Sequence, residues 1–173
     1  LGVGAAVARR ALGPRPGPGD VAAAAVVALA RGPHESVIHR RLLHASPRSV
    51  RGVVLDPGVG HRAHHVDPDV LDDALLRPAR AGAFLGLLAL YTAAICRVLR
   101  VPAATRRTAT AAVWAALLAY EWRHYLDHTS VPLRTRRARR LRAHHRAHHH
   151  VDERRDLGIT SRGTDVLVDR FAA

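Results

Sequence analysis

Histidine clusters at regular spacings constrain this chain more strongly than any other feature of its sequence. Thirteen of the 173 residues are histidine, which is more than a packed core or a solvated surface ordinarily needs. Most of them fall into four clusters, in the order HxxxxH, HxxHH, HxxxH and HxxHH. The clustered residues are His39, His44, His61, His64, His65, His124, His128, His145, His148 and His149. One cluster alone is a weak signal, but the four together predict metal ligands.

Helical geometry orients three of the four clusters. Residues i, i+3 and i+4 lie on one face of a helix, so the histidines within each HxxHH or HxxxH cluster point to the same side. His39 and His44 are five residues apart, about 140° around an ideal helix. They converge only if the helix bulges or ends there, or if they approach the site from two sides. Outside the pattern fall His34, His144 and His150, the last two expected on the solvent side or behind the ligands.

The number of imidazoles exceeds the demand of one ion. A structural zinc ion takes four ligands, and a catalytic one takes three plus water. Two ions sharing the ten histidines would receive about five each, which leaves room on octahedral iron for dioxygen or a bridging water. Glu35, Glu121 and Glu153 are the only glutamates, too few for the carboxylate-bridged di-iron design of helical bundles. The single cysteine, Cys96, lies in an apolar run and is expected to be a buried hydrophobe.

The sequence predicts one membrane domain, 20–173, after a Gly/Pro-rich N-terminal segment, 1–19. Two apolar runs, at 81–99 and 108–122, are joined by a short polar turn. Together they predict a helical membrane hairpin over about 81–122. The alternative is a hairpin in the core of a soluble helical bundle.

Two further stretches carry local structural signals. Asp20 is expected to cap the start of a helix whose apolar part is short for a membrane span. That helix can continue as far as Leu43, with a kink at Gly32 and Pro33. The region 45–60 is rich in proline and glycine and is expected to be irregular.

The charge balance indicates an anionic partner. The chain carries 27 basic residues, all arginine, against 14 acidic ones, a bias that coding composition explains in part. A phospholipid surface and nucleic acid both fit such a surface. Aromatic residues make up only 4% of the chain, too few for a base-stacking platform, so we expect no nucleic-acid partner. Nine arginines lie within 134–155, next to an apolar segment, and favour the cytoplasmic side of a membrane.

The order of the four clusters resembles the fatty acid hydroxylase and sterol desaturase superfamily of integral membrane di-iron enzymes, over roughly residues 20–171. The third cluster is most similar to the fatty acid 2-hydroxylase branch, and a GITS stretch at 158–161 is similar to the family's segment before a short terminal helix. The third-cluster residues that carry this likeness are Tyr120, Glu121, His124, Tyr125, His128 and Pro132.

The resemblance implies a fold, a chemistry and a location. The fold is an all-α integral membrane helical bundle, whose transmembrane helices are capped by a cytosolic, histidine-rich di-metal site. The ten clustered histidines would hold two iron ions, with dioxygen as co-substrate, and zinc can replace the iron in a purified sample. The reaction would insert a hydroxyl into an unactivated C–H of a lipid or fatty-acyl chain. Because the sequence shows no cytochrome b5-like segment, we expect a separate electron-donor protein.

Several alternatives stay open at this stage. A carotenoid ring hydroxylase uses the same chemistry, but its third cluster is usually HxxxxH rather than HxxxH. A sterol-type desaturase, a non-catalytic metal-binding membrane protein and an arginine-rich nucleic-acid binder are the others. Tyr120 and Glu121 either orient ligands from behind or simply pack and pair with an arginine.

Overall fold

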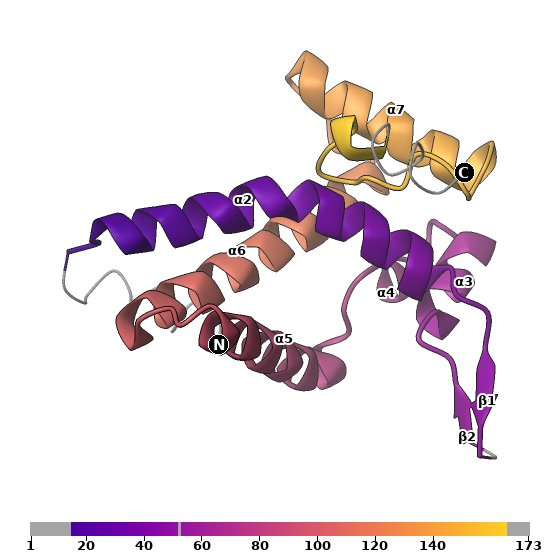
Figure 1. The fold of residues 1–173 in the computed structure, drawn as a ribbon. Helices are drawn as coiled ribbons and strands as arrows, with labels where there is room; N and C mark the ends of the chain where they lie inside the picture. The colour runs from indigo at the N-terminus through magenta and orange to yellow at the C-terminus, as the bar shows by residue number, and fades with distance from the viewer. Residues whose placement is uncertain (1–14, 52, 166–173) are drawn as a thin grey trace. The chain divides into compact units, whose positions relative to one another are not determined.

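Helices form nearly all the regular structure of the described residues, as expected for an all-α chain (Figure 1). The structure is a computed structural model that describes residues 15–51 and 53–165. Its elements are α2 (Pro18–Ile38), the π-helix η1 (His39–Leu43), β1 (Arg48–Val50), β2 (Val53–Leu55), α3 (Val59–Val66), α4 (Leu71–Ala74), α5 (Pro78–Val98), α6 (Ala103–Asp127) and α7 (Arg136–His150).

The chain divides into two compact units. The first contains the chain up to Arg31 together with Arg77–Ala119, and the second contains Gly32–Leu76 and the chain from Tyr120 onward. All ten clustered histidines belong to the second unit. The expected Gly/Pro-rich segment 1–19 and the expected terminal helix fall largely outside the described residues.

Hydrogen bonds tie the helices of the first unit together. The indole Nε1 of Trp114 in α6 donates to the Leu85 carbonyl of α5, at 3.1 Å. The Thr108 hydroxyl of α6 donates to Asp20 of α2, at 2.6 Å. Asp20 is not the N-cap that the sequence suggested: α2 begins at Pro18, and the Asp20 carboxylate reaches back to the Gly17 amide, at 2.9 Å. Proline is favoured at the first helical position, so the helix begins two residues before Asp20.

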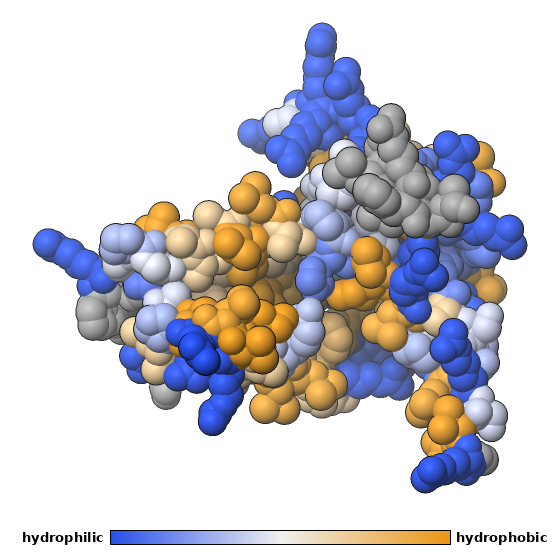
Figure 2. All heavy atoms as spheres, viewed as in Figure 1, coloured by the Kyte–Doolittle hydropathy of each residue, from blue (hydrophilic) through white to orange (hydrophobic). Residues whose placement is uncertain are grey.

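Apolar side chains cover the outside of the first unit rather than its interior. Leu29 is 80% exposed, Leu90 70% and Val98 81%, and Figure 2 shows hydrophobic side chains gathered over this part of the chain. Two stretches, Pro18–Leu43 and Leu71–Val98, are long and apolar enough to cross a membrane. Only 17% and 11% of their apolar windows are buried, whereas the core helix of a soluble bundle would be mostly buried.

This result changes which helices are the membrane candidates. The expected hairpin partner of α5 was the run at 108–122, now part of α6. α6 is 25 residues long, enough to span a bilayer, but it is not apolar enough to count as a candidate span. Arginines at its start and Glu121 and Arg123 toward its end interrupt the apolar run. α2 qualifies instead, because it runs through Pro33 without ending and is extended by η1.

The second unit contains a small β-hairpin that the sequence did not predict. β1 and β2 pair antiparallel, with Ser49 opposite Val54, inside the region expected to be irregular. The two consecutive valines of β2 are β-branched and favour the extended conformation. In the turn, Arg51 takes a left-handed φ of 50°. Every residue of both strands is exposed, so the hairpin adds little to the core.

A small apolar core stabilises the second unit beside its histidines. Leu157 and Ile159 are 1% and 0% exposed, and Leu141 of α7 is buried too. Figure 1 shows the segment that follows α7 folding back along that helix. Cys96, in the first unit, is a buried free thiol as expected.

Candidate metal centre

The ten clustered histidines converge into two groups of five. In each group, one ring nitrogen from every histidine lies within 4.8 Å of the others. We call the first group site A and the second site B. Site A consists of His39, His44, His61, His65 and His148, and site B of His64, His124, His128, His145 and His149. The ten residues predicted as ligands are therefore brought together without exception.

Site A is centred on His61. Its Nε2 atom lies 2.8 Å from that of His39, 3.1 Å from that of His44 and 3.1 Å from that of His65. The Nε2 atom of His148 lies 3.1 Å from that of His65, which closes the group. Two nitrogens bound at right angles to one ion, each at about 2.1 Å, would be about 3.0 Å apart. The observed spacing fits five ligands around one ion.

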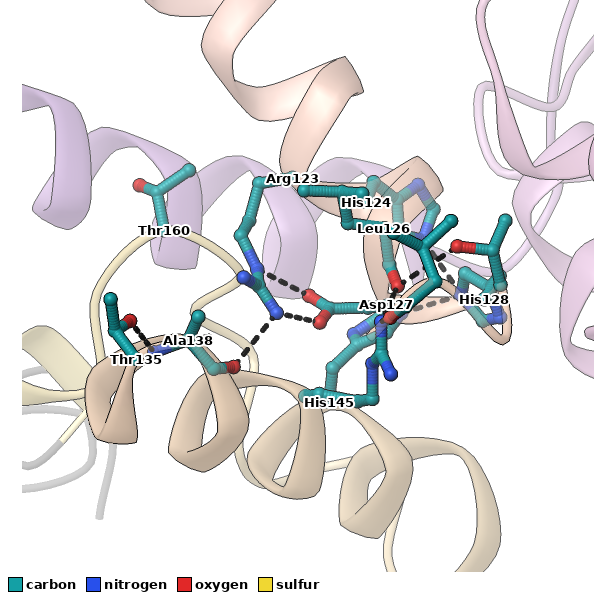
Figure 3. Close-up of polar contacts among 12 residues, drawn as sticks. Arg123, His124, Leu126, Asp127, His128, Thr135, Ala138, His145 and Thr160 are labelled. Atoms are coloured by element: carbon teal, nitrogen blue, oxygen red, sulfur yellow. Dashed lines mark hydrogen bonds and ion pairs between the residues drawn. The ribbon is translucent and has the colours of Figure 1, made fainter. Parts of the chain in front are cut away.

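Site B has the same arrangement around His128. Its Nε2 atom lies 3.0 Å from that of His64, 3.2 Å from that of His124 and 2.7 Å from that of His145. The Nε2 atom of His149 lies 3.1 Å from that of His145. In Figure 3, His124, His128 and His145 point toward one another: His124 comes from α6, His128 directly follows that helix, and His145 comes from α7.

Each HxxHH cluster divides between the two sites. In α3 the pair His61 and His65, four residues apart, enters site A, and His64 enters site B. In α7 the division is reversed, because His145 and His149 enter site B and His148 enters site A. Residues four apart lie almost directly above one another, which leaves the third histidine turned to the neighbouring site. The sequence alone left this partition open.

His39 and His44 meet through a local bulge, one of the routes the sequence allowed. Residues His39–Leu43 form a π-helix, and the His44 amide donates to the His39 carbonyl five residues earlier, at 3.0 Å. The wider π-turn brings a five-residue spacing close to one face. The two imidazole rings stack with centroids 5.1 Å apart.

Backbone carbonyls orient two ligands of site A from behind. His39 donates from Nδ1 to the Leu157 carbonyl, at 2.6 Å, and His148 donates from Nδ1 to the Arg155 carbonyl, at 2.8 Å. A carbonyl can only accept, so the ring proton sits on Nδ1 and the lone pair on Nε2 faces the site. This is the tautomer that a metal ion requires.

Burial keeps the imidazoles neutral. It lowers the pKa of His64 and of His148 to about 4, and that of His65 and of His128 to about 3. Neutral imidazole is the form that binds a metal.

The contacts within the two groups fit metal ligands better than hydrogen-bonded imidazoles. A neutral imidazole carries one N–H, so His61 Nε2 cannot form three hydrogen bonds with three other Nε2 atoms. The buried Nδ1 atoms of His64, His145 and His149 have no hydrogen-bond partner within the described residues. A ring whose Nδ1 is left unpaired and whose Nε2 faces four other nitrogens is stabilised best by a cation between them.

Comparison with known proteins agrees with this geometry. The family model described as fatty acid hydroxylase matches residues 24–169, which is most of the chain. The chain belongs to the fatty acid hydroxylase family. No curated protein matches it, and neither does any solved structure. The match stands at the level of the family, so the 2-hydroxylase branch stays a prediction.

Family membership gives the general class of activity. This fatty acid hydroxylase family member is a hydroxylase- or desaturase-type oxidoreductase associated with membranes. Its two five-histidine groups have the donor set of a metal-dependent enzyme.

Tyr120 and Glu121 lie in α6 close to site B. The Tyr120 ring centroid is 5.7 Å from that of His124, and the Glu121 carboxylate accepts from the Leu76 amide, at 2.8 Å. Glu121 thus connects α6 to Leu76, two residues after the end of α4. That Tyr120 or Glu121 orients a histidine of site B stays a prediction.

An ion pair that the sequence analysis missed joins α6 to α7 (Figure 3). Arg123 binds the buried Asp127 carboxylate through two nitrogens, and it also donates to the Ala138 carbonyl of α7, at 3.0 Å. Burial raises the pKa of Asp127, which the Arg123 pair partly offsets. Arg123 and Asp127 each directly precede a site B ligand, and their i, i+4 spacing was the available signal.

The structure also defines the surroundings of His144, which lies outside sites A and B. It is buried, and its two ring nitrogens lie 2.7 Å from Asp165 and 3.1 Å from Asp156. The sequence analysis expected His144 and His150 either on the solvent side or behind the histidines of the sites. His144 lies behind them, and His150 is exposed. Glu35, Ser36 and Asp165 are further buried polar residues of this unit that the sequence analysis did not single out.

Proposed function

We propose that this chain is an oxygen-dependent hydroxylase that inserts a hydroxyl into an unactivated C–H bond of a lipid or fatty-acyl chain. The observation that carries the proposal is the pair of five-histidine groups, in a member of the fatty acid hydroxylase family. We further propose that the resident metals are two iron ions, one in each group. When bound, they supply the redox chemistry with dioxygen that breaks such a bond.

The protein's own residues supply position and protection. Nitrogen donors alone, without carboxylates, fill both groups, and imidazole suits iron as well as zinc. Five histidines in each group would hold one iron ion and leave room on it for a substrate or co-substrate. His64, His145 and His148 are 0% exposed, so water reaches the ligand atoms poorly.

The membrane partner and the lipid substrate belong to the same proposal. Two stretches long and apolar enough to span a bilayer support a substrate that is itself dissolved in the membrane. The arginines of α7, exposed at Arg136, Arg137, Arg139 and Arg140, support a cytoplasmic position for the metal centre, as the positive-inside rule favours. Electrons would come from a separate donor protein on that side.

The experiment combines metal analysis with oxygen consumption. Protein purified in detergent is stripped of metal, loaded anaerobically with ferrous iron, and supplied with a chemical reductant, oxygen and lipids extracted from its host. We expect about two iron ions per chain, oxygen uptake, and a hydroxylated acyl chain detected by mass spectrometry. Zinc-loaded protein is the control, because zinc occupies the same donors but has no redox chemistry.

The outcomes separate this proposal from its rivals. Hydroxylated carotenoids with unchanged acyl lipids would indicate a carotenoid hydroxylase, and a new double bond would indicate a desaturase. Two bound iron ions without oxygen uptake would favour a non-catalytic metal protein and contradict the hydroxylase proposal.

A further inference from the structure

One face of α2 holds the segment that follows α7. Gly32, Glu35, Ser36 and His39 are spaced three, one and three residues apart, so they share a face of the helix. Each of the four contacts at least one residue of 157–165. We call residues 155–165 the clamp segment.

Glu35 makes the most bonds to the clamp segment. Glu35 as a whole is 9% exposed, and its carboxylate accepts from the amide of Ile159, from the amide of Thr160 at 2.8 Å, and from the Thr160 hydroxyl. A buried carboxylate that accepts several hydrogen bonds from one stretch of backbone fixes that stretch strongly. Glu35 therefore sets the position of residues 159 and 160.

Ser36 and Asp165 form the hydrogen bonds that hold the C-terminal end of the clamp segment. The Ser36 hydroxyl donates to Asp165, at 2.8 Å, and is 3.1 Å from the Thr164 hydroxyl. Asp165 also accepts from the Gly158 amide, at 3.0 Å, and pairs with His144 of α7. The segment is thus bonded to α2 and to α7.

Two glycines show how closely these parts pack. A Cβ at Gly32 would lie 2.7 Å from Thr164 Cγ2 and 3.2 Å from Ser161 Cβ. A Cβ at Gly158 would lie 2.0 Å from the Ser161 carbonyl oxygen. The Gly32 contacts leave the segment little room to shift relative to α2, and the Gly158 contact shows that the segment itself is tightly folded.

The clamp segment acts on only one of the two sites. Its carbonyls at Leu157 and Arg155 accept from the Nδ1 atoms of His39 and His148, both ligands of site A. In site B, the Nδ1 atoms of His64, His145 and His149 make no such bond within the described residues. The two sites therefore differ in how their ligands are supported.

We infer that Glu35 is a positioning residue for site A, acting through the clamp segment on His39 and His148. This inference rests on the proposed two-metal centre and adds that the affinities of its two sites are set separately. Residues that orient metal-bound histidines from behind are typically worth about 10- to 100-fold in metal affinity. Weakening the Glu35 contacts should lower the affinity of site A by about that factor and leave site B unchanged.

The test measures zinc affinity site by site. Metal-free full-length protein in detergent is titrated with zinc against a chromophoric chelator, and bound zinc per chain is counted by atomic emission. Glu35→Gln keeps the side-chain size but replaces one acceptor oxygen with an amide donor. Two backgrounds assign the effect: His124→Ala impairs site B, and His39→Ala impairs site A. Glu35→Gln should weaken the remaining site about tenfold or more in the first background and hardly at all in the second.

A milder pair of variants provides the matched control. Thr160→Val removes the hydroxyl that donates to Glu35 at nearly unchanged volume, whereas Thr160→Ser retains it. We expect weaker zinc binding at site A with valine and near-normal binding with serine. This pair keeps the test decisive if Glu35→Gln fails to fold.

The outcomes distinguish this inference from the proposed function. If the unaltered chain binds fewer than two zinc ions, the two-metal proposal itself fails. If it binds two, but the Glu35 and Thr160 variants weaken both sites equally or neither, the positioning role is wrong. A common loss at both sites would mean that the clamp segment only stabilises the unit as a whole.

Discussion

At the scale of single residues, His61 and His128 carry the most demanding positions. Each places its Nε2 atom within 3.2 Å of three other ligand nitrogens. Substituting either one removes the ligand nearest to the others of its site, so we expect His61→Ala and His128→Ala each to retain about one metal ion per chain. Oxygen uptake should fall by more than about 100-fold, because substituting a residue that only supports a ligand from behind already costs about 10- to 100-fold in activity.

His150→Ala is the control for these variants, because His150 lies on the same helix as three ligands but is exposed and outside both groups. It should retain about two metal ions per chain and near-normal oxygen uptake. Metal analysis of the purified variants checks both expectations, and an unchanged metal content in His61→Ala would contradict the assignment of site A.

The lowered histidine pKa values predict how the metal-free protein responds to pH. His64, His65, His128 and His148 titrate near 3 to 4 when folded, against an ordinary value of 6.5. Below pH 6.5 the unfolded chain therefore binds protons that the folded chain does not, and stability falls as pH decreases toward 4. Above pH 6.5 these groups contribute no pH dependence.

Denaturation of chelator-treated protein at pH 7.5, 6 and 5 measures this effect. We expect the unfolding midpoint to decrease at each step, and at least as steeply in protein loaded with zinc, because protons compete with the metal for the imidazoles. A midpoint that rises toward pH 5 would mean that the histidines are not held neutral in the folded state.

At the scale of elements, the junction between α6 and α7 depends on Arg123. Asp127 has no exposed side-chain surface, and Arg123 is its ion-pair partner as well as a donor to α7. Removing one partner of a buried pair leaves an uncompensated charge, so Arg123→Ala should destabilise the protein by about 3 kcal/mol. Arg137→Ala, at an exposed position of α7, should change stability by less than about 0.5 kcal/mol. Thermal or denaturant unfolding in the same detergent compares the two, and equal effects would contradict this role.

Two helical glycines should respond in opposite ways to the same substitution. Gly86→Ala adds a methyl group into open space on α5, where a Cβ meets nothing within 4 Å, and should gain up to about 1 kcal/mol of helix propensity. Gly32→Ala would collide with Thr164 and Ser161, so destabilisation should outweigh the same gain. The sign of the change in unfolding midpoint tests the packing of α2 on the clamp segment.

The sequence was sufficient to predict which ten histidines converge, but not how they divide between the two groups. The spacing of the four clusters named all ten residues of the two groups, whereas the five-residue gap between His39 and His44 left a bulge, a helix end and an approach from two sides open, and η1 forms the bulge. Which histidine faces which site depends on small rotations of α3 and α7, which a pattern cannot give. The Glu35 and Asp165 contacts join residues more than a hundred positions apart, and no local periodicity marks such pairs.

At the scale of the whole molecule, the arrangement of apolar surface predicts membrane insertion. The exposed leucines and valines of the first unit would be costly in water, and hydrophobic side chains cluster there in Figure 2. We expect the chain to remain with membranes after alkaline carbonate washing. Release into the soluble fraction would contradict an integral membrane protein.

The side of the membrane can be tested with the chain's single cysteine. In a Cys96→Ser background, Arg139→Cys places a thiol on the exposed surface of α7. A membrane-impermeant reagent should label this thiol only after the cells are permeabilised, because the cytoplasmic side of the membrane is otherwise out of its reach. Labelling of intact cells would place the metal centre outside, against the positive-inside rule.

The most direct measurement of the central proposal follows the oxygen atom. Iron-loaded protein is supplied with reductant, host lipids and dioxygen carrying the heavy oxygen isotope, and the extracted lipids are analysed by mass spectrometry. A hydroxylase with its metals in these two histidine groups should place one heavy oxygen atom in an acyl-chain hydroxyl, and His128→Ala should abolish that product. A chain that holds two iron ions yet yields no labelled lipid, or a hydroxyl whose oxygen comes from water, would contradict the proposal.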